Sequence, residues 1–65
     1  MGQWFKYTIE TDRDYVKVMR VVGDRVIAYC QDGFAYDEYF FRGKDLSQLK
    51  YLEEISEEEA FLKLL

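Results

Sequence analysis

Three turn signals divide the segment from Trp4 to Phe41, in which the apolar residues are mostly β-branched or aromatic. Such residues favour strands, and turn signals at short spacing mark the places where neighbouring strands reverse direction. The segment therefore predicts an antiparallel β-meander of four strands. They are expected near residues 3–10, 15–22, 25–31 and 34–42, separated by Thr11-Asp12-Arg13-Asp14, Gly23-Asp24 and Asp32-Gly33.

The turn residues also predict how these strands are paired. Asp32-Gly33 suits a two-residue type I′ turn, in which both positions need a positive φ angle, and Gly23-Asp24 suits a primed turn with glycine first. Side chains alternate between the faces of a strand, so loop length decides which residues share a face. Two-residue loops predict the opposed pairs Val22 with Arg25, Val18 with Tyr29, and Tyr29 with Tyr36.

With a similar loop at Asp12-Arg13, the predicted register leaves both faces of the sheet largely apolar. One face carries Phe5, Tyr7, Ile9, Val16, Val18, Arg20, Val22, Ile27, Tyr29, Phe34, Tyr36, Glu38 and Phe40. The other carries Trp4, Tyr15, Lys17, Met19, Val21, Val26, Ala28, Cys30, Ala35, Asp37, Tyr39 and Phe41. An antiparallel meander usually keeps one face polar. This sheet must therefore curl into a barrel or have both faces covered.

The last third of the chain predicts a short helical turn near residues 45–49, an extended piece over 51–55 and a helix over 57–65. Ser56-Glu57-Glu58-Glu59 is a capping box, and Ile55 is placed to contact Ala60 as a hydrophobic staple. We expect this helix to lie on the sheet face that carries the small residues Val26, Ala28 and Cys30. The whole chain is thus predicted to be one α+β domain over residues 1–65, a four- to five-stranded antiparallel meander with one C-terminal helix.

Two resemblances accompany this prediction. The segment Glu54–Leu64, which contains the letters E-I-S-E-E-E, resembles the C-terminal ends of small, uncharacterised bacterial and phage proteins, which implies a prokaryotic or phage setting. Four strands followed by a helical turn and a fifth extended piece resemble the order of elements in SH3-like small barrels. The C-terminal helix departs from that pattern.

The amino-acid composition of the chain argues against several classes of function. The chain has no His, and Cys30 is its only cysteine, so His-based catalysis, zinc sites and an internal disulfide are not expected. We expect no cofactor and no metal, a non-enzymatic protein and, in the absence of a membrane-spanning run or a signal peptide, a cytoplasmic location. Cys30 is expected to be a buried, unreactive residue. Asp12-Arg13-Asp14 lacks the later ligands of a calcium loop and is interpreted as a turn.

The formal net charge of −4 arises in residues 51–65, where five glutamates stand against Lys63. A negative net charge disfavours nucleic acid as a partner, because the neutralisation of phosphates by basic side chains supplies most of the affinity of proteins for nucleic acids. The glutamates, Glu57 and Glu58 among them, either complement the helix dipole or attract a basic partner surface. Asp37 and Glu38 should point to opposite faces, and Arg20 is expected to pair with Glu38.

The aromatic residues of the first face carry most of the functional information. They could form the interior of the monomer, a protein-protein surface such as a homodimer interface, or a platform for stacking bases. We expect a small interaction protein that docks a protein partner or a second copy. The alternative is a binder of single-stranded nucleic acid or a small ligand. The candidate interaction residues are Phe5, Tyr7, Arg20, Arg25, Tyr29, Phe34, Tyr36, Phe40, Glu57 and Glu58.

Overall fold

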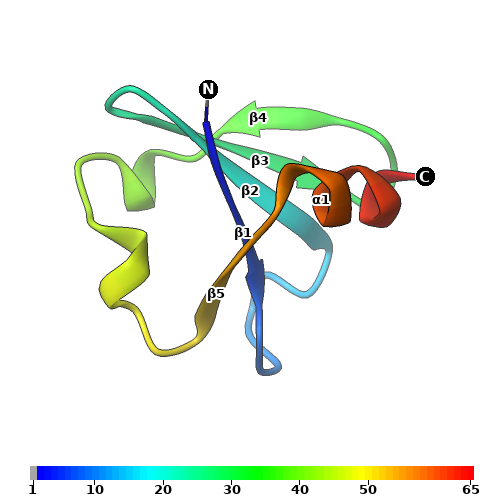
Figure 1. Cartoon of the computed structure of the whole chain (residues 1–65), viewed down its shortest axis with the longest axis horizontal. Helices are drawn as coiled ribbons and strands as arrows, with labels where there is room; N and C mark the ends of the chain where they lie inside the picture. The colour runs from blue at the N-terminus through cyan, green and yellow to red at the C-terminus, as the bar shows by residue number, and fades with distance from the viewer. Residues whose placement is uncertain (1) are drawn as a thin grey trace.

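A computed structural model describes residues 2–65 as an antiparallel sheet of five strands with one C-terminal α-helix (Figure 1). The predicted α+β meander with a C-terminal helix is confirmed. Two short 3-10 helices connect the fourth and fifth strands. The elements are β1 (Gln3–Tyr7), β2 (Val16–Val22), β3 (Arg25–Cys30), β4 (Ala35–Asp37), η1 (Tyr39–Phe41), η2 (Leu46–Gln48), β5 (Leu52–Ile55) and α1 (Glu57–Leu64).

The strands lie in the order β4-β3-β2-β1-β5. The first four form the meander, and β5 returns to pair with the free side of β1, where Trp4 lies opposite Ile55. The strands β4 and β5 therefore form the two edges. Since these edges do not pair with each other in the described part of the chain, the sheet is not closed into a barrel.

Two of the predicted strands are too long. β1 ends at Tyr7 rather than at residue 10, and a loop over residues 8–15 follows. β4 ends at Asp37 rather than at residue 42, because the Glu38 carboxylate accepts a hydrogen bond of 3.1 Å from the backbone N–H of Phe40. This local cap starts η1 and ends the extended backbone.

The β2–β3 hairpin has the predicted register, with Val22 opposite Arg25 and Val18 opposite Tyr29. The β3–β4 register is wrong by one residue, since Ala35 rather than Tyr36 lies opposite Tyr29. In this hairpin the N–H of Cys30 donates to the carbonyl of Phe34 at 2.8 Å, which leaves a three-residue loop. Gly33 has a φ of +91°, but no non-glycine residue from 2 to 65, Asp32 included, has a positive φ. A type I′ turn is therefore absent here, and Tyr36 moves to the opposite face.

The first strand is also displaced from the predicted register. Phe5 lies opposite Met19, and Trp4 lies on the other face of the sheet, opposite Arg20. The long loop over residues 8–15, rather than a two-residue turn, sets this pairing. A β-bulge then shifts the register between Val16 and Val18, so that these two valines also lie on opposite faces.

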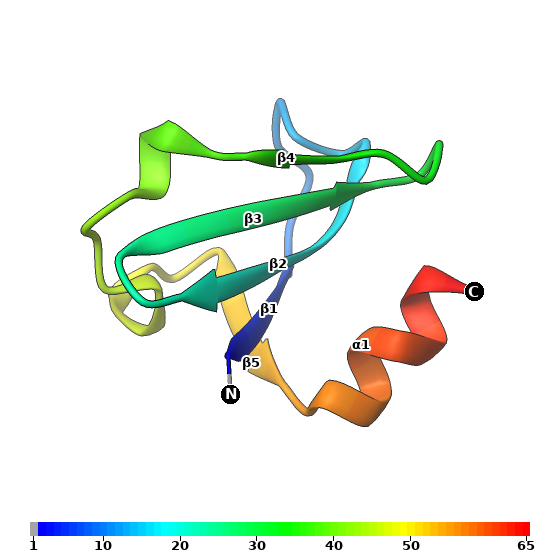
Figure 2. The ribbon, with the colours of Figure 1, turned by 90° about the horizontal axis from the view of Figure 1, so that it is seen from above.

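Two groups of buried residues lie on the two faces of the sheet. The first cluster contains Phe5, Val16, Met19, Val26, Ala28, Cys30, Phe41, Leu46 and Leu52. The second cluster contains Trp4, Val18, Ile55 and Ala60. The prediction that α1 covers Val26, Ala28 and Cys30 is wrong, because α1 packs on the second cluster and the segment with η1 and η2 covers the first. Both ribbon views show α1 and that segment at opposite sides of the strands (Figure 2).

The predicted start of the helix is confirmed. Ser56 is the N-cap of α1, and its hydroxyl accepts a hydrogen bond of 3.1 Å from the N–H of Glu59. Ile55 and Ala60 lie together in the second cluster, as a hydrophobic staple requires. The Glu59 carboxylate lies 3.5 Å from the ammonium group of Lys6, which ties α1 to β1.

Candidate functional site

A pocket of about 490 Å³ opens where the loop over residues 8–15 meets η1 and the start of β5. Its walls are mostly aromatic. Tyr7 comes from the end of β1, Phe40 and Phe41 come from η1, and the loop supplies most of the remaining lining. We call this site the aromatic pocket, lined by Tyr7, Ile9, Thr11, Asp12, Arg13, Tyr15, Phe40, Phe41 and Tyr51.

Two pairs of rings shape the pocket. Tyr7 and Tyr51 are stacked, with ring centroids 6.2 Å apart and an angle of 7° between the planes. The backbone N–H of Thr8 donates to the carbonyl of Tyr51 at 3.0 Å and holds this side in place. Phe40 and Phe41 meet edge to face at 4.9 Å. Phe41 is anchored in the first cluster, whereas Phe40 is 55% exposed at the rim.

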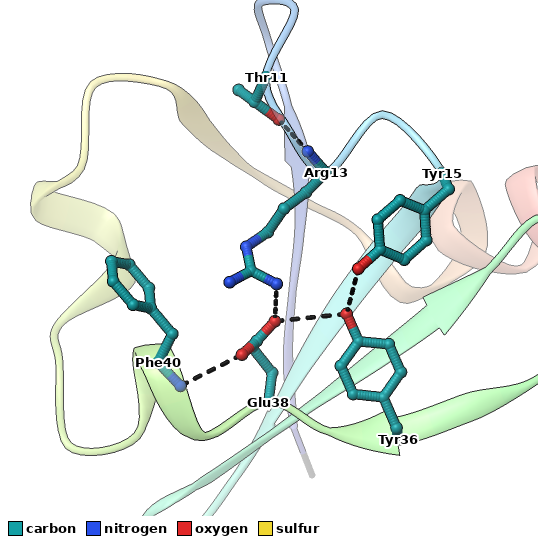
Figure 3. Close-up of polar contacts among 6 residues, drawn as sticks. All are labelled: Thr11, Arg13, Tyr15, Tyr36, Glu38 and Phe40. Atoms are coloured by element: carbon teal, nitrogen blue, oxygen red, sulfur yellow. Dashed lines mark hydrogen bonds and ion pairs between the residues drawn. The ribbon is translucent and has the colours of Figure 1, made fainter.

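Arg13 brings a positive charge between these walls. Its backbone N–H donates to the Thr11 hydroxyl at 3.0 Å, which fixes the turn (Figure 3). The guanidinium carbon lies 5.5 Å from the ring centre of Phe40 and 5.6 Å from that of Phe41. Nη1 of Arg13 donates to Glu38, so the loop and the start of η1 are joined by an ion pair.

Glu38 is the one buried residue with a charged or polar side chain in the described part of the chain. Its carboxylate accepts hydrogen bonds from Arg13, from the N–H of Phe40 and from the hydroxyl of Tyr36 at 3.3 Å. The hydroxyls of Tyr36 and Tyr15 are 3.1 Å apart (Figure 3). The Tyr36 hydroxyl donates its one proton to Glu38, so the Tyr15 hydroxyl must be the donor in the contact between the two tyrosines. The hydrogen bonds of this network therefore run from Tyr15 to Tyr36 and from Tyr36 to the carboxylate.

Two tyrosine hydroxyls next to this ion pair resist ionisation. Burial raises the pKa of Tyr7 to about 12, and the opposing charges of Arg13 and Glu38 act on it in opposite directions. Burial, with the Tyr15 hydrogen bond and the charge of Glu38, also raises the pKa of Tyr36 above its usual value. The Tyr7 hydroxyl is buried and has no hydrogen-bond partner within residues 2–65. At neutral pH it is a neutral donor without an acceptor.

The ion pair neutralises the charge that Arg13 brings to the pocket wall. Burial by itself lowers the pKa of Arg13, but Glu38 and the neighbouring tyrosine hydroxyls together raise it by more, so the guanidinium stays charged. Between residues 2 and 65, no three His, Cys, Asp or Glu side chains are grouped to hold a metal ion. The Cys30 thiol lies in the first cluster, and burial raises its pKa. This arrangement of rings and donors is suited to binding.

The structure separates most of the predicted interaction residues. Tyr7 and Phe40 line the pocket, and Tyr36 lies in the network beside it. The other predicted residues lie outside this site. Phe5 is buried in the first cluster, whereas Tyr29 and Arg20 lie against Trp4 on the other face of the sheet. Arg25 forms an ion pair with Asp37, Phe34 is 73% exposed on the β3–β4 hairpin, and Glu57 and Glu58 are exposed on α1.

Two specific predictions are corrected by this geometry. The six aromatic residues do not share one face, because the register of both outer hairpins differs from that of two-residue loops. Arg20 does not pair with Glu38. Instead its guanidinium lies 5.4 Å from the ring centre of Trp4, and Arg13 is the partner of Glu38.

Sequence reasoning missed Arg13, Tyr15 and Tyr51 as parts of one site. Arg13 was hidden in a segment interpreted as a simple turn. A usable signal was Glu38, since a carboxylate placed among apolar strand residues needs a cation or several donors nearby. The chain offers such a cation in the loop before β2.

The helical segments between residues 2 and 65 are all too short or too polar to span a bilayer. Comparisons of the chain with models of protein families, with curated proteins and with solved structures gave no match.

Proposed function

We propose that this chain is a non-enzymatic binding protein that docks a partner protein through the aromatic pocket. The observation that carries the proposal is the pocket itself, a concave site with aromatic walls and a fixed arginine. Aromatic residues and arginine are enriched at protein interfaces, where they supply much of the binding energy. The rim also exposes large apolar side chains, with Ile9 62% and Phe40 55% exposed.

The acidic helix supports the same proposal as a source of long-range attraction, since it lies on the other side of the sheet from the pocket (Figure 2). Glu57 and Glu58 are exposed in the first turn of α1, and the net charge of −4 is concentrated in residues 51–65. Charges of this kind accelerate encounter with an oppositely charged partner. A partner with a positive net charge therefore fits best. This long-range attraction should weaken as the ionic strength rises.

Selection from a random peptide library displayed on phage tests the docking function. Peptides enriched on the wild-type chain should bind the Phe40→Asp variant at least about tenfold more weakly, since a hot-spot residue contributes more than about 1.4 kcal/mol. Phe34→Asp is the matched control, because Phe34 is also an exposed phenylalanine but does not line the pocket. Failure to enrich any peptide, or equal losses for both variants, would contradict the proposal.

A small ligand or a single-stranded nucleic acid is the second candidate. The volume of about 490 Å³ lies within the range of small-molecule sites, roughly 300–1,000 Å³, and the Tyr7 and Tyr51 rings could face a planar group. The negative net charge weighs against phosphate. Binding of a labelled oligonucleotide that disappears in high salt and in the Phe40→Ala variant would favour this candidate instead.

A further inference from the structure

We propose that the aromatic pocket accepts an uncharged, apolar side chain of a partner protein segment together with a main-chain carbonyl of that segment. This inference rests on the proposed docking function and names the chemistry of the group that enters. Three properties of the pocket lead to it: the balance of its charges, the hydrogen-bonding capacity that it leaves unused, and the nature of its walls.

The charges of the pocket disfavour a charged ligand of either sign. The guanidinium of Arg13 is neutralised by Glu38, a buried carboxylate that does not itself line the pocket. An entering carboxylate would add a second negative charge near Glu38, with Asp12 also on the pocket wall. An entering ammonium group would instead face Arg13, and the attraction of Asp12 offsets that repulsion only in part, because Asp12 is exposed and water screens its charge. A neutral group avoids both costs, which are large where water is excluded.

The hydrogen-bonding capacity that remains is on the donor side. Both oxygens of Glu38 already accept, Oε1 from the N–H of Phe40 and Oε2 from Arg13 and Tyr36. Arg13 uses Nη1 for this bond, which leaves the hydrogens of Nε and Nη2 for another acceptor. The Tyr7 hydroxyl also lacks a partner within residues 2–65, but it is buried beneath the pocket wall and cannot be reached by an entering group, so Arg13 is the donor that remains. The missing complement is an acceptor, and a peptide carbonyl supplies one without a charge.

The walls favour an apolar side chain next to that carbonyl. The stacked rings of Tyr7 and Tyr51 form one side, and Phe40 and Ile9 form the exposed rim. An aromatic or branched aliphatic side chain gains most by displacing water from such surfaces. A side chain and its own carbonyl are joined by two bonds, so one residue of the partner can fill both requirements.

Three probes with the same benzyl group test the ligand class. They are the neutral N-acetyl-phenylalanine amide, the carboxylate N-acetyl-phenylalanine, and the cation phenylalanine amide. Each is titrated into the isotope-labelled chain while NMR follows the backbone amides of Thr11, Arg13 and Phe40, with Glu58 as a remote reference. We expect the neutral probe to bind at least about tenfold more tightly than either charged probe. Equal or tighter binding of a charged probe would overturn the proposed ligand class but leave the docking function standing. If no probe moves the pocket amides, both proposals fail at this site.

Substitutions give an independent reading. Glu38→Gln leaves the charge of Arg13 unbalanced, so the carboxylate probe should gain at least about fivefold relative to the neutral probe. Phe40→Ala should weaken the neutral probe at least about threefold, because it removes an exposed apolar part of the pocket wall, whereas Phe34→Ala, at an exposed phenylalanine outside the pocket, should leave it unchanged. Unchanged probe preference in a folded Glu38→Gln variant, or equal effects of the two phenylalanine substitutions, would contradict the inference. If Glu38→Gln does not fold, the wild-type series and the phenylalanine pair still decide it.

Discussion

Glu38 shows how one residue can change the structure around it. The strand predicted over residues 34–42 includes Glu38, yet the backbone leaves the sheet at this residue. A buried carboxylate must be compensated, and here the compensation comes from a cation 25 residues earlier, from a phenol and from a backbone N–H. The same side chain therefore ends β4, begins η1 and positions Arg13 in the pocket.

Replacing Glu38 by Gln should lower the free energy of unfolding by about 1–3 kcal/mol, because it breaks the ion pair while keeping the shape of the side chain. The lower part of this range is expected, since the Arg13 side chain is 29% exposed and water can reach the guanidinium that is left unpaired. Urea unfolding measures the change. Glu58→Gln, on an exposed residue, should change stability by less than about 0.5 kcal/mol. Similar values for both variants would argue against a structural role of the Glu38 charge.

The raised pKa of Tyr7 predicts that the folded chain loses stability at alkaline pH. Its pKa is about 12 in the folded chain against 10.0 ordinarily, so the unfolded chain releases this proton first as the pH rises. Its contribution is complete below pH 10 and falls between pH 10 and 12, by at most about 1.4 kcal/mol per pH unit. Over that interval the free energy of unfolding of the wild type should therefore decrease relative to that of Tyr7→Phe, which has no phenol to ionise at this position. At pH 7 the variant should be at least as stable, because the hydroxyl it removes has no partner. Parallel curves for the two proteins would contradict the assignment.

At the scale of elements, the types of structure could be predicted from the sequence, but the faces could not. Val22 and Arg25 flank a two-residue turn, whose loop length follows from a single glycine, and their pairing was predicted correctly. Asp32-Gly33 also predicts a two-residue turn, with glycine at the second position, yet it closes a three-residue loop. Because a one-residue change moves every side chain to the other face, this small difference relocated Tyr36.

The pocket could not be predicted for a related reason. It joins Arg13 from a loop, Phe40 from a 3-10 helix and Tyr51 from the segment before β5. These segments are brought together by the pairing of β5 with β1 and by the buried ion pair, and neither leaves a periodic pattern in the sequence. Tyr7 and Phe40 were predicted as interaction residues from their aromatic character, although the face assigned to them was wrong.

The β3–β4 loop gives a prediction that separates the observed turn from a type I′ turn. Gly33→Ala should cost about 1–2 kcal/mol, because φ is +91° there, while an added Cβ would meet no atom within 4 Å. Asp32→Gly should also destabilise, by about 0.5–1.5 kcal/mol, since the Asp32 carboxylate accepts a 3.0 Å bond from the N–H of Phe34. A type I′ turn would instead gain from glycine at position 32. Urea unfolding of the two variants measures both changes, and a stabilised Asp32→Gly variant would contradict the structure.

At the scale of the whole molecule, the chain covers both faces of its own sheet. The segment with η1 and η2 lies over the first cluster, and α1 lies over the second. The homodimer stays a prediction, with fewer aromatic side chains available on one face than the sequence implied. Sedimentation equilibrium distinguishes it from a monomer of 7.9 kDa.

The two clusters should unfold as one unit, because β1 and β2 each contribute to both. Trp4 and Val18 belong to the second cluster, while their neighbours Phe5 and Met19 belong to the first. Loss of either cluster would expose the other side of the same strands. A domain of this size is therefore expected to show two-state behaviour rather than separate opening of α1.

Two probes built into the chain can test this cooperativity. Trp4, the only tryptophan, reports on the second cluster by fluorescence, and the Cys30 thiol, whose pKa is raised by burial, reports on the first by its rate of labelling. Leu64→Ala, on α1, should lower the free energy of unfolding measured by both probes equally, by about 1–2 kcal/mol for a half-buried leucine. The substitution lies on the far side of the sheet from Cys30, so faster labelling can reach it only through shared unfolding. A shifted Trp4 transition with unchanged labelling of Cys30 would show that α1 opens alone.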